Sequence, residues 1–144
     1  MAAPENFHLQ RFVEAQESSF DRALIELRDG RKQSHWMWFI FPQLAGLGRS
    51  PTAQFYAIRS LEEGRAYLDH PLLGSRLRQS VEALLTGSAK RTAEEILGPI
   101  DAIKLRSSLT LFDAVEPGGL FHQALLSFFA GPDECTLALL QRSS

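Results

Sequence analysis

His35 is the side chain of this sequence best placed for acid–base chemistry. It follows Ser34, a residue type that caps helix N-termini, and precedes the aromatic segment 36–41. The positive end of a helix disfavours the protonated imidazole, and a neutral imidazole can act as a general base or as a hydrogen-bond acceptor. The alternative is structural: the ring hydrogen-bonds a backbone carbonyl and supports the aromatic segment.

A second group of polar side chains interrupts an apolar stretch near residue 105. Lys104, Ser107 and Ser108 have the spacing i, i+3 and i+4, so on a helix they share one face. Such a face can contact an anionic ligand. A Ser–Lys nucleophilic pair would further require a lysine that burial deprotonates. The structural alternative is that the Ser108 hydroxyl donates a hydrogen bond to the backbone carbonyl of Lys104.

A glycine-containing loop, residues 46–51, ends in a helix start signal. Arg49 precedes Ser50 and Pro51, a capping hydroxyl followed by proline at the first helical position. Backbone amides at a helix start, together with an arginine, can hold a phosphate or a carboxylate. The loop matches neither the P-loop nor the dinucleotide fingerprint, so a plain capped loop is the alternative.

Composition argues against several classes of function. The formal net charge of −2 and the pI near 6.1 argue against a dedicated nucleic-acid binder. Cys135 is the single cysteine and no two histidines have ligand spacing, so we expect no disulfide within the chain, no metal site and no cofactor. No apolar run is long enough to span a membrane, and residues 1–6 lack a secretory signal. We therefore expect a cytoplasmic protein.

The apolar periodicity is helical almost throughout, which predicts an all-α fold. We expect one compact domain over residues 1–144, with a core from about 7 to 140 and about seven to nine short helices. Gly30 is expected to end a helix, and Thr92 with Glu95 matches a capping box.

Two further expectations concern the aromatic segment and the apolar faces of the helices. The segment is predicted to form a helix from an N-cap at Ser34 to Pro42, with a buried strand as the alternative. Phe55, Ile103 and Leu137 are expected to face the core, because each falls among apolar residues at helical spacing.

Four segments of the chain resemble the signature of domain-of-unknown-function family 1810. They are RFVEAQ at 11–16, SHWMWFIFPQ at 34–43, GLGRSPTAQFYAI at 46–58 and KLRSSLTLF at 104–112. Members are small, mostly bacterial proteins, and the resemblance implies an all-helical single-domain fold from roughly Phe7 to Leu140. It implies no activity and no catalytic residues. The label "calpastatin" that some members carry does not fit, because calpain inhibitors of that kind are long and disordered whereas this composition is globular.

These observations lead to one main hypothesis and two alternatives. The main hypothesis is a polar-edged pocket, built by the SHWMWFIFPQ and KLRSS motifs, that binds a small anionic or phosphate-bearing ligand. The first alternative is a protein–protein interaction module that uses the aromatic segment as a groove, and the second is an enzyme with His35 as general base. The candidate ligand-binding residues are His35, Trp38, Gln43, Arg49, Lys104, Ser107 and Ser108.

Overall fold

The computed structural model describes residues 7–87 and 91–143, and over these residues the fold is all-α. It has ten helices there, roughly consistent with the expected number of about seven to nine, and Gly98 and Pro99 separate the seventh helix from the eighth. In chain order the helices are α1 (Gln10–Glu17), α2 (Phe20–Asp29), α3 (Met37–Ile40), α4 (Pro51–Phe55), α5 (Leu61–Asp69), α6 (Leu73–Gly87), α7 (Ala93–Leu97), α8 (Pro99–Val115), α9 (Leu120–Phe128) and α10 (Glu134–Ser143).

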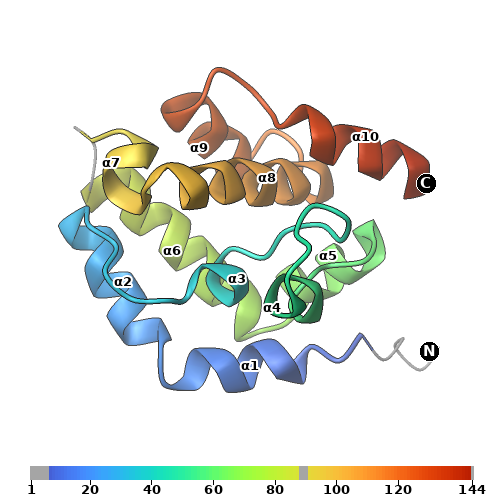
Figure 1. Cartoon of the computed structure of the whole chain (residues 1–144), viewed down its shortest axis with the longest axis horizontal. Helices are drawn as coiled ribbons and strands as arrows, with labels where there is room; N and C mark the ends of the chain where they lie inside the picture. The colour runs from blue at the N-terminus through green and yellow to red at the C-terminus, as the bar shows by residue number, and fades with distance from the viewer. Residues whose placement is uncertain (1–6, 88–90, 144) are drawn as a thin grey trace.

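α8 is the central helix of the fold (Figure 1). It runs across the molecule and packs against α5, α7, α9 and α10, whereas α6 packs against α2, α5 and α9. The fully buried side chains of α8 include Leu105, Leu109 and Phe112, and every residue from 107 to 112 is buried. A helical segment that is covered all round belongs inside a core, and this explains its place.

Aromatic rings link the layers of the core. The ring of Tyr67 on α5 lies 5.0 Å from that of Phe12 on α1 and 5.5 Å from that of Phe112 on α8, and Phe112 lies 5.6 Å from Phe121 on α9. All four side chains are fully buried, within one apolar cluster that extends along the chain to Leu140. Large rings in contact supply much of the buried apolar area that holds these helices together.

Most predicted helix ends are confirmed. Gly30 ends α2 with a φ of 74°, a left-handed conformation that glycine adopts without strain. The hydroxyls of Ser50 and Ser60 accept the backbone N–H three residues on, and Thr92 and Glu95 form the reciprocal capping box.

The predicted helix over the aromatic segment is wrong in extent. Only Met37–Ile40 is helical, and Ser34 does not cap it, because its hydroxyl and its backbone N–H both donate to the side chain of Glu26. Trp36 takes the N-cap position without a side-chain capping bond. A tertiary partner on α2 thus decides the conformation here in place of the local capping preference.

The predicted inward positions of three apolar side chains are also wrong. Phe55 is 51% exposed, Ile103 63% and Leu137 38%. Ile103 follows the buried Ala102 by one residue, which is about 100° around the helix, so it falls outside the stripe that faces the core. Spacing alone could not tell which apolar side chains of α8 and its neighbours would be covered.

One buried ion pair joins α1 to α5. The guanidinium of Arg11 lies 3.0 Å from the carboxylate of Glu63, and both side chains are buried. Each N–H of Arg11 has an acceptor, and besides Glu63 the acceptors are the backbone carbonyls of Phe7, His8, Phe55 and Ala57. A buried charge with all its donors satisfied is compatible with a folded core.

Within the ranges 7–87 and 91–143, no helix is long and apolar enough to cross a bilayer. Residues 1–6, which the expectation about a secretory signal concerns, lie outside the described residues.

Candidate functional site

The polar residues that begin the aromatic segment bind the side chain of Glu26 on α2. The two carboxylate oxygens of Glu26 accept hydrogen bonds from the backbone N–H groups of Gln33 and Ser34, the Ser34 hydroxyl and the Trp36 indole, at 2.7–3.0 Å. Burial raises the pKa of Glu26, but the four hydrogen bonds together outweigh it and lower the pKa to about 2. Ser34 and Trp36 therefore have a structural role in this motif.

Two lysines share one aspartate beside the tryptophans. The Lys32 ammonium lies 3.1 Å from Oδ2 of Asp101, and the Lys104 ammonium lies 3.5 Å from Oδ1. Each ammonium also sits over an indole, Lys32 at 5.2 Å from the Trp36 ring and Lys104 at 4.8 Å from the Trp38 ring. Cation–π contact and ion pairing together hold each lysine in one place.

A hollow of about 260 Å³ opens beside Lys104, where the loop after α3 and the start of α10 meet α8. Figure 1 shows α8 crossing the molecule between these two segments. The loop contributes Gln43, Leu47 and Gly48; α8 contributes Ile100, Ile103, Lys104 and Ser107; Asp133 and Cys135 come from the start of α10. An apolar lining with a few polar groups is typical of small-molecule sites.

Several polar atoms around the hollow have hydrogen-bonding capacity left. Among the described residues, no partner contacts the Gln43 amide, and Lys104 has one carboxylate neighbour for its three N–H donors. Oδ2 of Asp133 accepts from the N–H and hydroxyl of Thr136 and, at 3.5 Å, from Ser107, while its Oδ1 receives no bond from a described residue. A ligand in the hollow would meet both donors and acceptors.

The structure brings four of the seven predicted site residues to this place. Gln43, Lys104 and Ser107 line the hollow, and Trp38 lies under the Lys104 ammonium. The two motifs that we expected to meet thus both contribute to its lining. Whether a ligand binds there stays a prediction.

The other three predicted residues lie outside the hollow. His35 is exposed, and its ring makes no hydrogen bond or ion pair with a described residue, so nothing holds it as a general base. Arg49 is exposed and is not in its lining. The Ser108 hydroxyl is buried and has no hydrogen-bond partner among the described residues, so the predicted bond to the Lys104 carbonyl is absent.

The glycine loop is explained by packing. A Cβ on Gly48 would come 2.5 Å from the Cβ of Ala53, and Gly46 has a φ of 104°. The following helix, Pro51–Phe55, is little more than one turn and is capped by Ser50. Of the two alternatives for this loop, the plain capped loop accounts for both glycines without a ligand.

A family model described as "Protein of unknown function (DUF1810)" matches residues 6–140. The chain belongs to this family. Its fold is similar to the crystal structure of the conserved hypothetical protein Rv1873 from Mycobacterium tuberculosis, with 47% sequence identity, a TM-score of 0.91, and coverage of 95% of this chain and 99% of that one. No curated protein matches the chain. The resemblance found in the four sequence segments is thus confirmed for the family and its fold.

The aromatic segment of this family member offers no groove for a partner. Trp36, Met37, Ile40 and Phe41 are at most 2% exposed, and only Trp38 and Phe39 are half-buried. The interaction alternative fails in the form that the sequence suggested, because most side chains of the segment are packed in the hydrophobic core and do not form an exposed groove.

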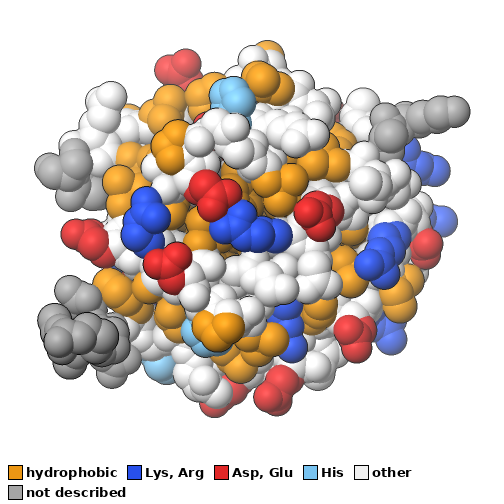
Figure 2. All heavy atoms as spheres, turned by 180° about the vertical axis from the view of Figure 1, so that it is seen from behind, with side chains coloured by type: hydrophobic (Ala, Val, Ile, Leu, Met, Phe, Trp, Pro, Cys, Tyr) orange, Lys and Arg blue, Asp and Glu red, His pale blue; other side chains and the backbone are white. Residues whose placement is uncertain are grey.

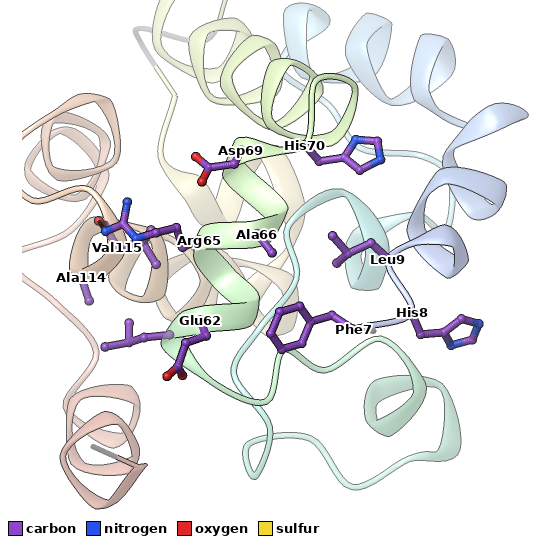
Figure 3. A pocket seen from close by; sticks show the side chains of 11 residues that line it. Phe7, His8, Leu9, Glu62, Arg65, Ala66, Asp69, His70, Ala114 and Val115 are labelled. Atoms are coloured by element: carbon purple, nitrogen blue, oxygen red, sulfur yellow. Dashed lines mark hydrogen bonds between the residues drawn. The ribbon is translucent and has the colours of Figure 1, made fainter. Parts of the chain in front are cut away.

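A larger depression, of about 850 Å³, lies over the outer face of α5 (Figure 3), and sequence analysis did not find it. Phe7 and Leu9 point toward α5, whereas the His8 ring points away, and Glu62 and Asp69 lie at opposite ends of the helix. The remaining polar groups serve local structure: Arg65 donates to the carbonyl of Val115, and Nδ1 of His70 accepts the N–H groups that begin α6. No set of polar groups converges on one point there.

The face seen in Figure 2 shows basic and acidic side chains interspersed, with apolar atoms between them. Neither charge forms a continuous stripe on this face. Recognition of a nucleic-acid backbone depends on such a stripe of lysines and arginines, so this face does not have the character of a phosphate-tracking surface.

Proposed function

We propose that the chain binds a small molecule through an anionic group, in the hollow between the loop at 43–48, the first half of α8 and the start of α10. The observation that carries the proposal is the position of Lys104. Its ammonium stands at the edge of a mainly apolar hollow, where it lies over the ring of Trp38 and 3.5 Å from Asp101, and the contact with the ring holds it there. A positioned cation beside apolar walls binds a carboxylate or a phosphate better than a mobile surface lysine does, because less conformational entropy is lost.

Further support comes from the groups beside Lys104. The Gln43 amide and the Ser107 hydroxyl line the same hollow and can donate to the same anion. Its volume of about 260 Å³ suits a metabolite-sized ligand, not a nucleotide. The proposed role is binding. The cytoplasmic location expected from the sequence remains part of this proposal.

The proposal is tested by thermal unfolding of the purified chain in the presence of inorganic phosphate, acetate and short aliphatic carboxylates. A ligand that binds only the folded state raises the midpoint by mass action, by the equivalent of about 2.7 kcal/mol at a hundred times its Kd. The comparison is between wild type, Lys104→Met and the control Arg22→Met, which removes an exposed cation of α2.

We expect at least one of these anions to raise the midpoint of wild type and of Arg22→Met and to leave that of Lys104→Met unchanged. Equal shifts in all three proteins, or no shift with any of the anions, would contradict the proposal. Tryptophan emission, which comes from Trp38 under the Lys104 ammonium together with the neighbouring Trp36, gives an independent readout of binding at this place.

A further inference from the structure

The lining of the hollow includes one positively and one negatively charged side chain. Lys104 and Asp133 both line it, and Oδ1 of Asp133 receives no hydrogen bond from a described residue. Ser107 stands one helical turn after Lys104 and its hydroxyl lies 3.5 Å from Asp133. The carboxylate of Asp133 therefore lies beside the same face of α8 that carries Lys104, next to the residue one turn further along.

The charged side chains at and next to the hollow have a net charge of zero. Lys32 and Lys104 are positive, Asp101 and Asp133 are negative, and the four groups sum to zero. A phosphate dianion in the hollow would bring two negative charges to a neutral set and would face the carboxylate of Asp133. A ligand that carries its own positive charge avoids this repulsion.

The remaining walls are hydrocarbon. Leu47, Ile100 and Ile103 line the hollow, and the two isoleucines are 70% and 63% exposed without a ligand. Covering such side chains with an aliphatic group is favourable, because apolar surface leaves water. A hollow of about 260 Å³ has room for a short aliphatic side chain beside the charged groups.

We infer that the ligand is a free α-amino acid with a branched aliphatic side chain, of the size of leucine or isoleucine. Its carboxylate pairs with Lys104, its ammonium donates to Oδ1 of Asp133, and its side chain packs on Ile100, Ile103 and Leu47. This inference rests on the proposed function and adds the chemical class of the ligand to it.

The test is isothermal titration of the full chain with ligands that each lack one feature of leucine. They are 4-methylpentanoate, which lacks the amino group, 3-methylbutylamine, which lacks the carboxylate, and glycine, which lacks the side chain; inorganic phosphate is the fourth probe. We expect leucine to bind at least about tenfold more tightly than each of them, because each probe lacks at least one of the contacts that leucine makes with Lys104, Asp133 and the apolar wall.

The variant Asp133→Asn tests whether Asp133 accepts the hydrogen bond from the ammonium of the ligand. Asparagine caps a helix as well as aspartate does, so α10 keeps its N-cap while the negative charge is lost. We expect the affinity for leucine to fall about tenfold in this variant and the affinity for 4-methylpentanoate to stay within about twofold. The neighbouring exposed acid provides the control, since Glu134→Gln should leave both affinities unchanged.

The titrations on wild type decide the matter even if a variant is unstable. Binding of 4-methylpentanoate or phosphate as tight as that of leucine overturns the amino-acid inference and leaves the proposed anion site standing. Absence of binding by leucine, the carboxylate and phosphate overturns both.

Discussion

The indole Nε1 of Trp36 donates a hydrogen bond of 2.9 Å to Oε1 of Glu26, ten residues earlier in the chain. Both side chains are buried, and the same carboxylate receives three further bonds from Gln33 and Ser34. One acidic residue of α2 thereby fixes the whole turn that leads into the aromatic segment. Ser34 and Trp36 of the family motif thus serve to donate hydrogen bonds to this carboxylate.

Replacing Glu26 should destabilise the fold without altering its surface. In Glu26→Gln the uncharged amide can accept at one oxygen only, so at least one buried donor loses its partner. We expect a loss of about 2–4 kcal/mol in the free energy of unfolding, measured by urea denaturation at pH 7. Glu14→Gln, at an exposed position of α1, is the control and should cost less than about 0.5 kcal/mol.

The stabilisation from Glu26 should depend on pH in a defined window. Its pKa is lowered from 4.5 to about 2 in the folded state, so folding favours the ionised form. The contribution is complete above pH 4.5 and is lost as the pH falls toward 2, and it amounts to about 3 kcal/mol at most. The difference in unfolding free energy between wild type and Glu26→Gln should stay constant from pH 5 to 8 and shrink below pH 4.5. A difference that grows on acidification would refute this assignment.

The ion pair between Arg11 and Glu63 should be strongly coupled to stability. Arg11→Met leaves the Glu63 carboxylate and four backbone carbonyls without their donor, and we expect a loss of about 3–5 kcal/mol. Arg22→Met, at an exposed position of α2, should change the unfolding free energy by less than about 0.5 kcal/mol. A cost below about 1 kcal/mol for Arg11→Met would show that the pair is not needed.

Local signals in the sequence were sufficient to predict the family, the all-α class and most helix ends. Gly30, Ser50 and Thr92 act through neighbours within four residues, and such short-range effects can be read from spacing. Ser34 shows where this approach fails. Its residue type favours capping, but its partner is a carboxylate on another helix, and no local pattern reveals that.

In the candidate site, too, spacing predicted the short-range relationships but not the tertiary ones. The spacing of Lys104 and Ser107 correctly placed both on one face of a helix, and both line the hollow. Asp133 is not among the predicted site residues, because its place beside the hollow depends on α10 returning to the middle of α8. The burial of Ser108 one residue after Ser107 likewise depends on which side of α8 the neighbouring helices cover.

Gly48 should tolerate no side chain. A Cβ there would lie 2.5 Å from the Cβ of Ala53, so Gly48→Ala must push the loop away from α4, at a cost of about 1–3 kcal/mol. Gly131→Ala is the matched control, since nothing lies within 4 Å of its added Cβ. The midpoint of thermal unfolding should fall clearly in Gly48→Ala and stay unchanged in Gly131→Ala. Equal midpoints would mean that packing does not explain this glycine.

Asp101 should act as a competitor for the anion that Lys104 binds. Its carboxylate lies 3.5 Å from the Lys104 ammonium, and a ligand carboxylate must share that ammonium with it. Removing the competing charge in Asp101→Asn should raise the affinity for 4-methylpentanoate by about three- to tenfold, consistent with roughly 1 kcal/mol between such charges in a water-like medium. The titration is followed by tryptophan emission at low and high salt, and the gain in affinity should be smaller at high salt because the charges are screened.

The control is Asp113→Asn, which removes another half-buried carboxylate of α8. Asp113 interacts with Gly118 and His122 and lies outside the lining of the hollow, so this variant should leave the affinity for 4-methylpentanoate unchanged. An unchanged or weaker affinity in Asp101→Asn would mean that Asp101 holds Lys104 in place more than it competes for it. In that case the aspartate is a positioning residue, and Lys104→Arg, which keeps the charge but changes its geometry, should lower the affinity as well.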